Sequence, residues 1–127
     1  MDPVEERRKD IQANIQKNPA TITIHRTEKA EDSGGFRKTE SELSPIVVRI
    51  YQKNSISIKH VSNLSGTKDV SSKWGLLADY QADIKAGPNV LDEFDVNGIG
   101  HFQIIDVTPQ RVNGQLAGFQ ADLEKVV

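Results

Sequence analysis

The stretch that decides the fold is VLDEFDVNGIGHFQIIDVTPQRVNGQLAGFQADLEKV, residues 90–126. It places two Asn-Gly pairs, at residues 97–98 and 113–114, between segments rich in β-branched and aromatic residues. An Asn-Gly pair in that position is the strongest local signal for a type I′ β-hairpin. After the second pair, apolar and polar residues alternate, as they do along a strand with one buried face. The apolar positions are Ala117, Phe119, Ala121 and Leu123, and the intervening ones are Gly118, Gln120, Asp122 and Glu124. The pattern predicts antiparallel hairpins.

The same period of two continues upstream as far as Ala20. ATITIHRTEK (20–29) alternates isoleucine with polar residues, and PIVVRIYQ (45–52) is β-branched and mostly apolar; both patterns indicate strands. Between them, AEDSGGFRKTESELS (30–44) has a Gly-Gly turn and a weak alternation, which predicts an extended and only partly ordered hairpin. We predict strands near residues 20–27, 45–52, 75–84, 90–96, 101–107 and 116–124. Short strands with frequent turns favour a mainly β fold, a small antiparallel β-barrel or sandwich.

One helix is predicted at the N-terminus, in DPVEERRKDIQANIQKNP (2–19). Asp2 is the N-cap, Pro3 occupies the first helical position, and Glu5 completes a capping box. The Asn-Pro pair at residues 18–19 ends the helix, which gives a range of 3–17. Its apolar residues form a narrow stripe, so we expect the helix to pack by one edge on the sheet or on a neighbouring subunit. These residues are Val4, Ile11 and Ile15.

Length and composition indicate a single domain over residues 1–127 with a thin core. Hydrophobic residues make up 36% of the chain, so the core is either small or shared with neighbouring subunits. The chain has no cysteine, which excludes disulfides and thiolate chemistry and fits assembly in a reducing cytoplasm. No apolar run approaches the length of a membrane span, and the charged N-terminus does not resemble an export signal.

The motifs that carry catalytic or metal chemistry are missing or incomplete. The three histidines, His25, His60 and His101, each lack a ligand-spaced partner. EFDVNG (93–98) has EF-hand-like spacing, but the twelfth position is Ile104 instead of the bidentate glutamate. SGTKD (65–69) lacks the spacing of a phosphate-binding loop. We therefore predict no catalytic residue, no metal site, no cofactor and no enzymatic activity.

Charge is distributed unevenly along the chain. Residues 1–73 carry a net charge of +3, residues 74–127 carry −5, and the whole chain carries −2. Neither part has the dense Lys/Arg stripe of a dedicated nucleic-acid reader. The single tryptophan, Trp74, lies near the junction of these two parts, and we expect it to anchor the core.

KNSISIKHVSNLSGTKDVSSK, residues 53–73, separates two predicted strands by an unusually long distance. Connections of this length are uncommon in compact domains and are usually functional or disordered. The segment is rich in serine, and its apolar residues follow no sustained period, so neither a buried strand nor an amphipathic helix is strongly encoded. We predict a long inter-strand loop that is mobile or extended in the free protein.

The order of these parts resembles the XkdH/YqbH-like proteins of PBSX-type Bacillus prophages, which are related to the head-closure, or stopper, proteins of long-tailed phages. The resemblance spans nearly the whole chain and is most specific where IIDVTP (104–109) leads into the second Asn-Gly hairpin and GFQADLE (118–124). It implies a small β-barrel that forms a ring beneath the portal and adaptor proteins and closes the DNA exit channel after packaging. The better-known stoppers lack so developed an N-terminal helix.

The resemblance also implies partners and a location. The partners would be the portal and adaptor connector proteins, a tail-completion protein, ring mates of the same chain and, non-specifically, packaged DNA; no membrane is involved. The isolated chain would be a monomer or weak oligomer that becomes a ring only on its adaptor, assembled in the bacterial host cytoplasm into the neck of the virion. An alternative is a stand-alone, monomeric β-barrel binding module with a disordered loop.

By position, the closing element of the family corresponds to the loop at residues 53–73. Its candidate residues are Lys53, Ile56, Ile58, Lys59, His60, Val61, Leu64, Lys68 and Lys73.

Overall fold

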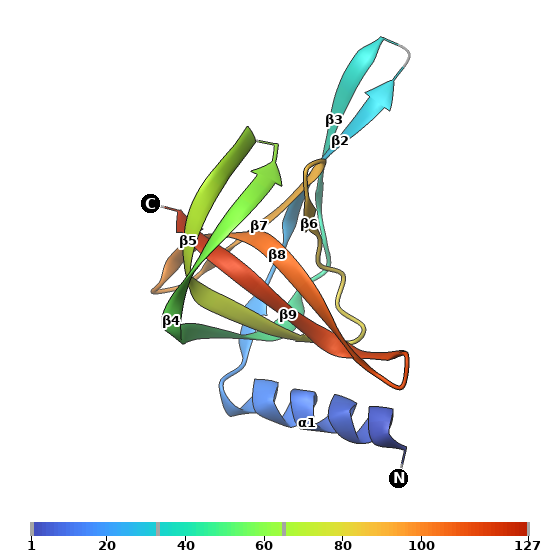
Figure 1. Cartoon of the computed structure of the whole chain (residues 1–127). Coiled ribbons are helices and arrows are strands. Elements are labelled where there is room, and N and C mark those ends of the chain that lie inside the picture. Colours follow the sequence, from blue (N-terminus) through green and yellow to red (C-terminus); the bar gives the residue numbers. More distant parts are fainter. Residues whose placement is uncertain (1, 33, 65, 127) are drawn as a thin grey trace.

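The computed structural model describes residues 2–32, 34–64 and 66–126, without the side chains of residues 32, 56, 57, 59, 63 and 71. Within these residues the chain forms one helix followed by a nine-stranded antiparallel sheet (Figure 1). The mainly β fold with one N-terminal helix is therefore confirmed. The elements are α1 (Pro3–Lys17), β1 (Ala20–Ile22), β2 (His25–Asp32), β3 (Gly35–Glu42), β4 (Ile46–Asn63), β5 (Gly66–Asp79), β6 (Ala86–Gly87), β7 (Val90–Val96), β8 (Gly100–Val112) and β9 (Gln115–Val126).

The helix begins and ends where its capping residues predict. The Asp2 side chain accepts a hydrogen bond from the Val4 N–H at 3.1 Å, and the Asn18 N–H donates to the Ile15 carbonyl at 3.1 Å. These two bonds satisfy backbone groups that a helix end otherwise leaves unpaired. The predicted range of 3–17 is confirmed.

The helix lies across one end of the barrel and packs by one edge, as its narrow stripe predicts (Figure 1). The Arg8 guanidinium donates two hydrogen bonds to the Leu116 carbonyl, at 3.0 and 2.9 Å, and lies 3.9 Å from the centre of the Tyr80 ring. The helix therefore attaches to the sheet by both apolar and polar contacts. Its buried cluster consists of Val4, Ile11 and Ile15 of α1, Leu77 of β5 and Ala117 of β9.

The sheet is strongly curled, because one segment of chain contributes to both ends of it. The strand order is β1-β4-β5-β9-β8-β7-β2-β3, with β6 paired to β7. Only Thr23 and Ile24 separate β1, which pairs with β4, from β2, which pairs with β7. This short segment holds the edge strand β1 close to β2, the last strand but one at the other end of the sheet, and the inner face of the curled sheet encloses the main core. That core contains Ile22, Ile24, Val48, Ile50, Leu76, Ala78, Ile84, Phe94, Phe102, Ile104, Ala121 and Leu123.

Trp74 packs at the edge of this core, as expected. Its ring lies 5.3 Å from that of Phe102 in an edge-to-face arrangement, and Phe102 lies 5.8 Å from Phe94. Aromatic pairs in these geometries add to the stability gained by burial alone.

The two Asn-Gly pairs both form hairpins, but with different turns. At the β8–β9 turn, Asn113 and Gly114 both have positive φ, 52° and 79°, as a type I′ turn requires. At the β7–β8 turn, Gly98 has φ 81°, and the Ile99 N–H donates to the Val96 carbonyl at 3.1 Å. This second loop spans residues 97–99 instead of two residues, so the prediction of a type I′ turn there is wrong although the hairpin is confirmed.

Two predicted strand boundaries also need correction. The strand predicted at 75–84 ends at Asp79, because residues 80–85 form a turn and an irregular connection. The strand predicted at 20–27 is divided at residues 23–24, where the chain passes from β1, which pairs with β4, to β2, which pairs with β7 and β3. Upstream of β4, β2 and β3 form the predicted hairpin, which projects well beyond the barrel (Figure 1).

Candidate functional site

The segment predicted as a mobile loop, residues 53–73, is a β-hairpin. Val61 of β4 pairs with Lys68 of β5, and the ladder runs from residues 57–63 to residues 66–72. The prediction of irregular structure is therefore wrong. The prediction failed because the apolar residues of this segment do not share one face. Ile58 is 77% exposed and Val61 is 6% exposed, so these two residues lie on opposite faces of the strand. A search for apolar residues on a single face does not find such a strand.

A large bulge separates this hairpin from the barrel. Gln52 pairs with Trp74, but the next pair is Ser57 with Ser72, so residues 53–56 lie opposite Lys73 alone. An insertion of this kind bends a strand and interrupts its ladder. The hairpin leaves the barrel at this bulge, on the side away from α1 (Figure 1).

Two of the predicted lysines are held by carboxylates of β9. Lys53 is largely buried, forms an ion pair with Asp122 and donates to the Ser72 hydroxyl at 3.3 Å. Lys68 lies 3.5 Å from Glu124. Ser72 is fully buried and donates to the Leu123 carbonyl at 3.0 Å. These two lysines therefore contact the subunit's own acidic residues.

The apolar residues of the hairpin also differ in their surroundings. Val61 and Val70 are buried with Ile105 of β8 in a small cluster apart from the main core. Ile58, on the opposite face, is exposed, and Leu64 at the turn is partly buried. Val61 thus stabilises the position of the hairpin on its own barrel, whereas Ile58 is available to another molecule.

The remaining residues of the predicted closing loop are either exposed or have side chains that lie outside the described part of the structure. His60 is exposed, and its Nδ1 lies 3.0 Å from an oxygen of Asp69. Lys73 is exposed at the bulge. The side chains of Ile56 and Lys59 lie outside the described residues.

A groove of about 540 Å³ runs between the hairpin and the end of β9. One carboxylate oxygen of Glu124 is buried there without a hydrogen-bond partner among the described atoms. A second hollow of about 410 Å³ lies beside Tyr51 and Asp122. Burial, together with the charge of Asp122, raises the pKa of the Tyr51 hydroxyl. The first groove is lined by Gln52, Lys68, Asp69, Val70, Lys73, Trp74, Glu124 and Lys125.

The β2–β3 hairpin is a second exposed feature, and sequence reasoning assigned it no function. All of β3 is exposed, and Phe36 keeps 71% of its surface in solvent. The Lys29 ammonium lies 4.1 Å from the centre of the Phe36 ring. The sequence signals for this hairpin are the Gly-Gly turn at residues 34–35 and a weak alternation, and neither indicates how far the strands project.

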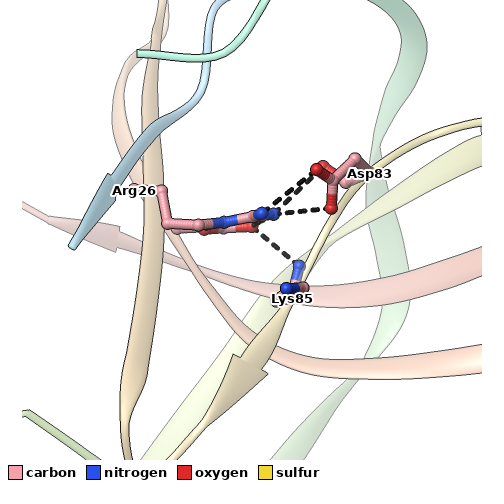
Figure 2. Close-up of polar contacts among 4 residues, drawn as sticks. Arg26, Asp83 and Lys85 are labelled. Atoms are coloured by element: carbon pink, nitrogen blue, oxygen red, sulfur yellow. Dashed lines mark hydrogen bonds and ion pairs between the residues drawn. The ribbon is translucent and has the colours of Figure 1, made fainter. Parts of the chain in front are cut away.

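A buried ion pair fixes the start of this hairpin to the barrel (Figure 2). Arg26 is 4% exposed and donates to both oxygens of Asp92, at 2.7 and 2.9 Å; Asp92 is fully buried. Arg26 also reaches the carboxylate of Asp83, at 3.0 and 3.1 Å, while the Lys85 N–H donates to Asp92 at 2.7 Å. The hydrogen bond to Asp92 raises the pKa of Arg26, and the hydrogen bond from Arg26 lowers the pKa of Asp83.

Neither a metal site nor a membrane-spanning helix is found in the described part of the chain. No group of three or more His, Asp or Glu residues in this part is placed to hold a metal ion. The same residues include no helix that is both long and apolar enough to cross a bilayer. In comparisons with known proteins, no protein-family model and no curated protein matches this chain.

Proposed function

We propose that this chain is a structural subunit of a phage or prophage neck. Its copies form a ring in the head-tail connector, close the DNA exit channel after packaging and provide the surface to which the tail attaches. The portal and adaptor proteins and a tail-completion protein are its neighbours. The chain is not an enzyme in this proposal and works in the virion.

The observation that carries the proposal is the projecting β4–β5 hairpin. Residues 57–63 and 66–72 extend past a bulge, on a ladder of their own, and Ile58 stands 77% exposed on one face. An exposed isoleucine gains stability when a neighbour covers it, and in a ring each hairpin meets its symmetry mates near the axis. Such a set of hairpins is able to obstruct a central channel.

The second candidate is a monomeric β-barrel binding module. It is favoured by the contact of Val61 and Val70 with Ile105, because this contact covers part of the hairpin within a single subunit. A ring is not needed to keep that cluster out of water. The two candidates differ in whether the chain joins a portal-adaptor complex as a ring, which electron microscopy of the mixed proteins measures directly.

Deletion of residues 55–72, bridged by a short Gly/Ser turn, tests the closing role. The main core lies outside this segment, so the barrel should fold and the chain should still join the neck, while filled heads lose their DNA. Circular dichroism and Trp74 fluorescence check the fold, and nuclease sensitivity of packaged DNA measures the leak. Asp10→Asn, at an exposed position of α1, is the control. Unfolding of the deletion variant, or heads that retain their DNA, would show that the hairpin is not the gate.

A further inference from the structure

Within the described residues, the outer part of the β4–β5 hairpin is attached to the barrel by side chains rather than by a backbone ladder. We call residues 57–63 and 66–72 the outer hairpin. β4 pairs with β1 only at residues 46–48, and β5 pairs with β9 only at residues 74–79. The bulge at residues 53–56 lies between these pairings and the outer hairpin. The outer hairpin can therefore change its angle while every hydrogen bond of the barrel ladder is kept.

Among the described side chains, two ion pairs contribute to this attachment, each between an acidic residue of β9 and a lysine. Asp122 and Glu124 alternate with core residues along β9, so both project from the face of the strand opposite the core. Asp122 pairs with Lys53 at the bulge, and Glu124 pairs with Lys68 of the outer hairpin. Carboxylates in this arrangement present to the lysines the same charge that DNA phosphates would present.

The apolar part is the cluster of Val61, Val70 and Ile105, which are 6%, 4% and 7% exposed. Each strand of the outer hairpin supplies one valine. Ile105 lies at an irregularity in the pairing of β8 with β9. Because this cluster is separate from the main core, opening it leaves the barrel interior intact.

We propose that Asp122 and Glu124 act as an internal substitute for DNA phosphate and hold the outer hairpin in a stowed position. A polyanion competes with these two carboxylates for Lys53 and Lys68. When the polyanion displaces the carboxylates, the outer hairpin rotates about the bulge. The inference goes beyond the proposed function, since it concerns a property of the isolated chain and requires neither a ring nor a phage. It would hold equally for a stand-alone module.

The first test removes the acidic charges without changing side-chain size. Asp122→Asn/Glu124→Gln is compared with a control of equal charge change, Asp10→Asn/Glu28→Gln, at exposed positions of α1 and β2. Hydrogen exchange of backbone amides in the outer hairpin should accelerate about fivefold or more in the first variant, the factor expected from losing about one effective ion pair. Exchange in β7 and β8 should stay unchanged.

The same two variants are titrated with a short random-sequence DNA duplex at low salt, by fluorescence anisotropy. The variant that frees the lysines should bind more tightly than the control, even though both have gained the same net charge. Equal affinity for the two variants would overturn the role of the carboxylates as a phosphate substitute. Unchanged exchange in the outer hairpin would overturn the latch itself.

A second test locks the outer hairpin in the stowed position with an introduced disulfide. The chain has no cysteine, so no native thiol competes with the introduced pair. Val61→Cys/Ile105→Cys joins two side chains of the buried cluster. The oxidised protein should show slower exchange in the outer hairpin and weaker DNA binding, and reduction should reverse both. An oxidised protein that binds DNA as well as the reduced one would contradict the proposal.

Discussion

Replacing Arg26 with alanine should be the most damaging single change outside the apolar core. The substitution removes both hydrogen bonds from Arg26 to Asp92, which lies fully buried. One donor to Asp92 remains, the Lys85 N–H at 2.7 Å. Removing one partner of a buried ion pair costs about 3–5 kcal/mol. Because the backbone donor stays, we expect the lower end, about 3 kcal/mol. That is a large part of the roughly 5–15 kcal/mol that stabilises a small domain.

Urea unfolding followed by Trp74 fluorescence measures this loss. Trp74 is the only tryptophan and packs 5.3 Å from Phe102, so its emission reports the integrity of the barrel. Arg37→Ala, on exposed β3, removes the same side chain where it is not buried, and should change the free energy of unfolding by about 0.5 kcal/mol or less. The double substitution Arg26→Met/Asp92→Leu should recover much of the loss, because apolar pairs often replace buried ion pairs without cost.

Two results would refute this reasoning. If Arg26→Ala destabilises the protein no more than Arg37→Ala, the ion pair is not what fixes the base of the β2–β3 hairpin. If the Arg26→Met/Asp92→Leu double variant is less stable than Arg26→Ala alone, the damage comes from lost packing and not from the charge left on Asp92.

The other substitutions test the helix contact, the acid sensitivity and the exposed hairpin. A methyl group at Gly118 would lie 2.7 Å from the Ile11 side chain and 2.9 Å from a backbone oxygen, so Gly118→Ala should lower the free energy of unfolding by about 1–3 kcal/mol, whereas Gly34→Ala, with open space around it, should not. The folded-state pKa of Asp83 lies below its ordinary 3.8, so the contribution of this carboxylate to the free energy of unfolding is present above that pH and is lost as the pH falls below it. Asp83→Asn should therefore weaken the pH dependence of the urea midpoint below about pH 4, and an unchanged dependence would contradict this. Phe36→Ala should leave stability within about 0.5 kcal/mol, because the ring is 71% exposed, and a larger loss in urea unfolding would mean that the ring is part of the fold.

The helix and the C-terminal strands could be predicted because their signals are local. Asp2 caps the helix through Val4, two residues along the chain, and Asn113-Gly114 sets its hairpin through the φ angles of those two residues alone. Along β9, one buried face gives the alternation directly. In each case, neighbouring residues carry all the information that the element needs.

The hairpin at residues 53–73 and the buried ion pair between Arg26 and Asp92 both depend on contacts between residues that are distant in the sequence. Val61 and Val70 are buried by Ile105, which lies on another strand, and Lys68 is matched by Glu124. Without these contacts the segment reads as polar and irregular, although residues 57–63 and 66–72 form a continuous ladder. The pairing of Arg26 with residue 92 likewise spans 66 positions, and no local pattern indicates it.

The β2–β3 hairpin buries so little surface that its length cannot be explained by the stability of the monomer. Every residue of β3 is exposed, and an isolated pair of strands is at best marginally stable in water. Its free edge also carries basic residues at 37–38 and acidic residues at 40 and 42, and charges of this kind oppose indiscriminate pairing with other strands. A partner strand that pairs with this edge must carry charges of opposite sign in the corresponding order. We therefore expect the hairpin to be stabilised by a specific neighbour.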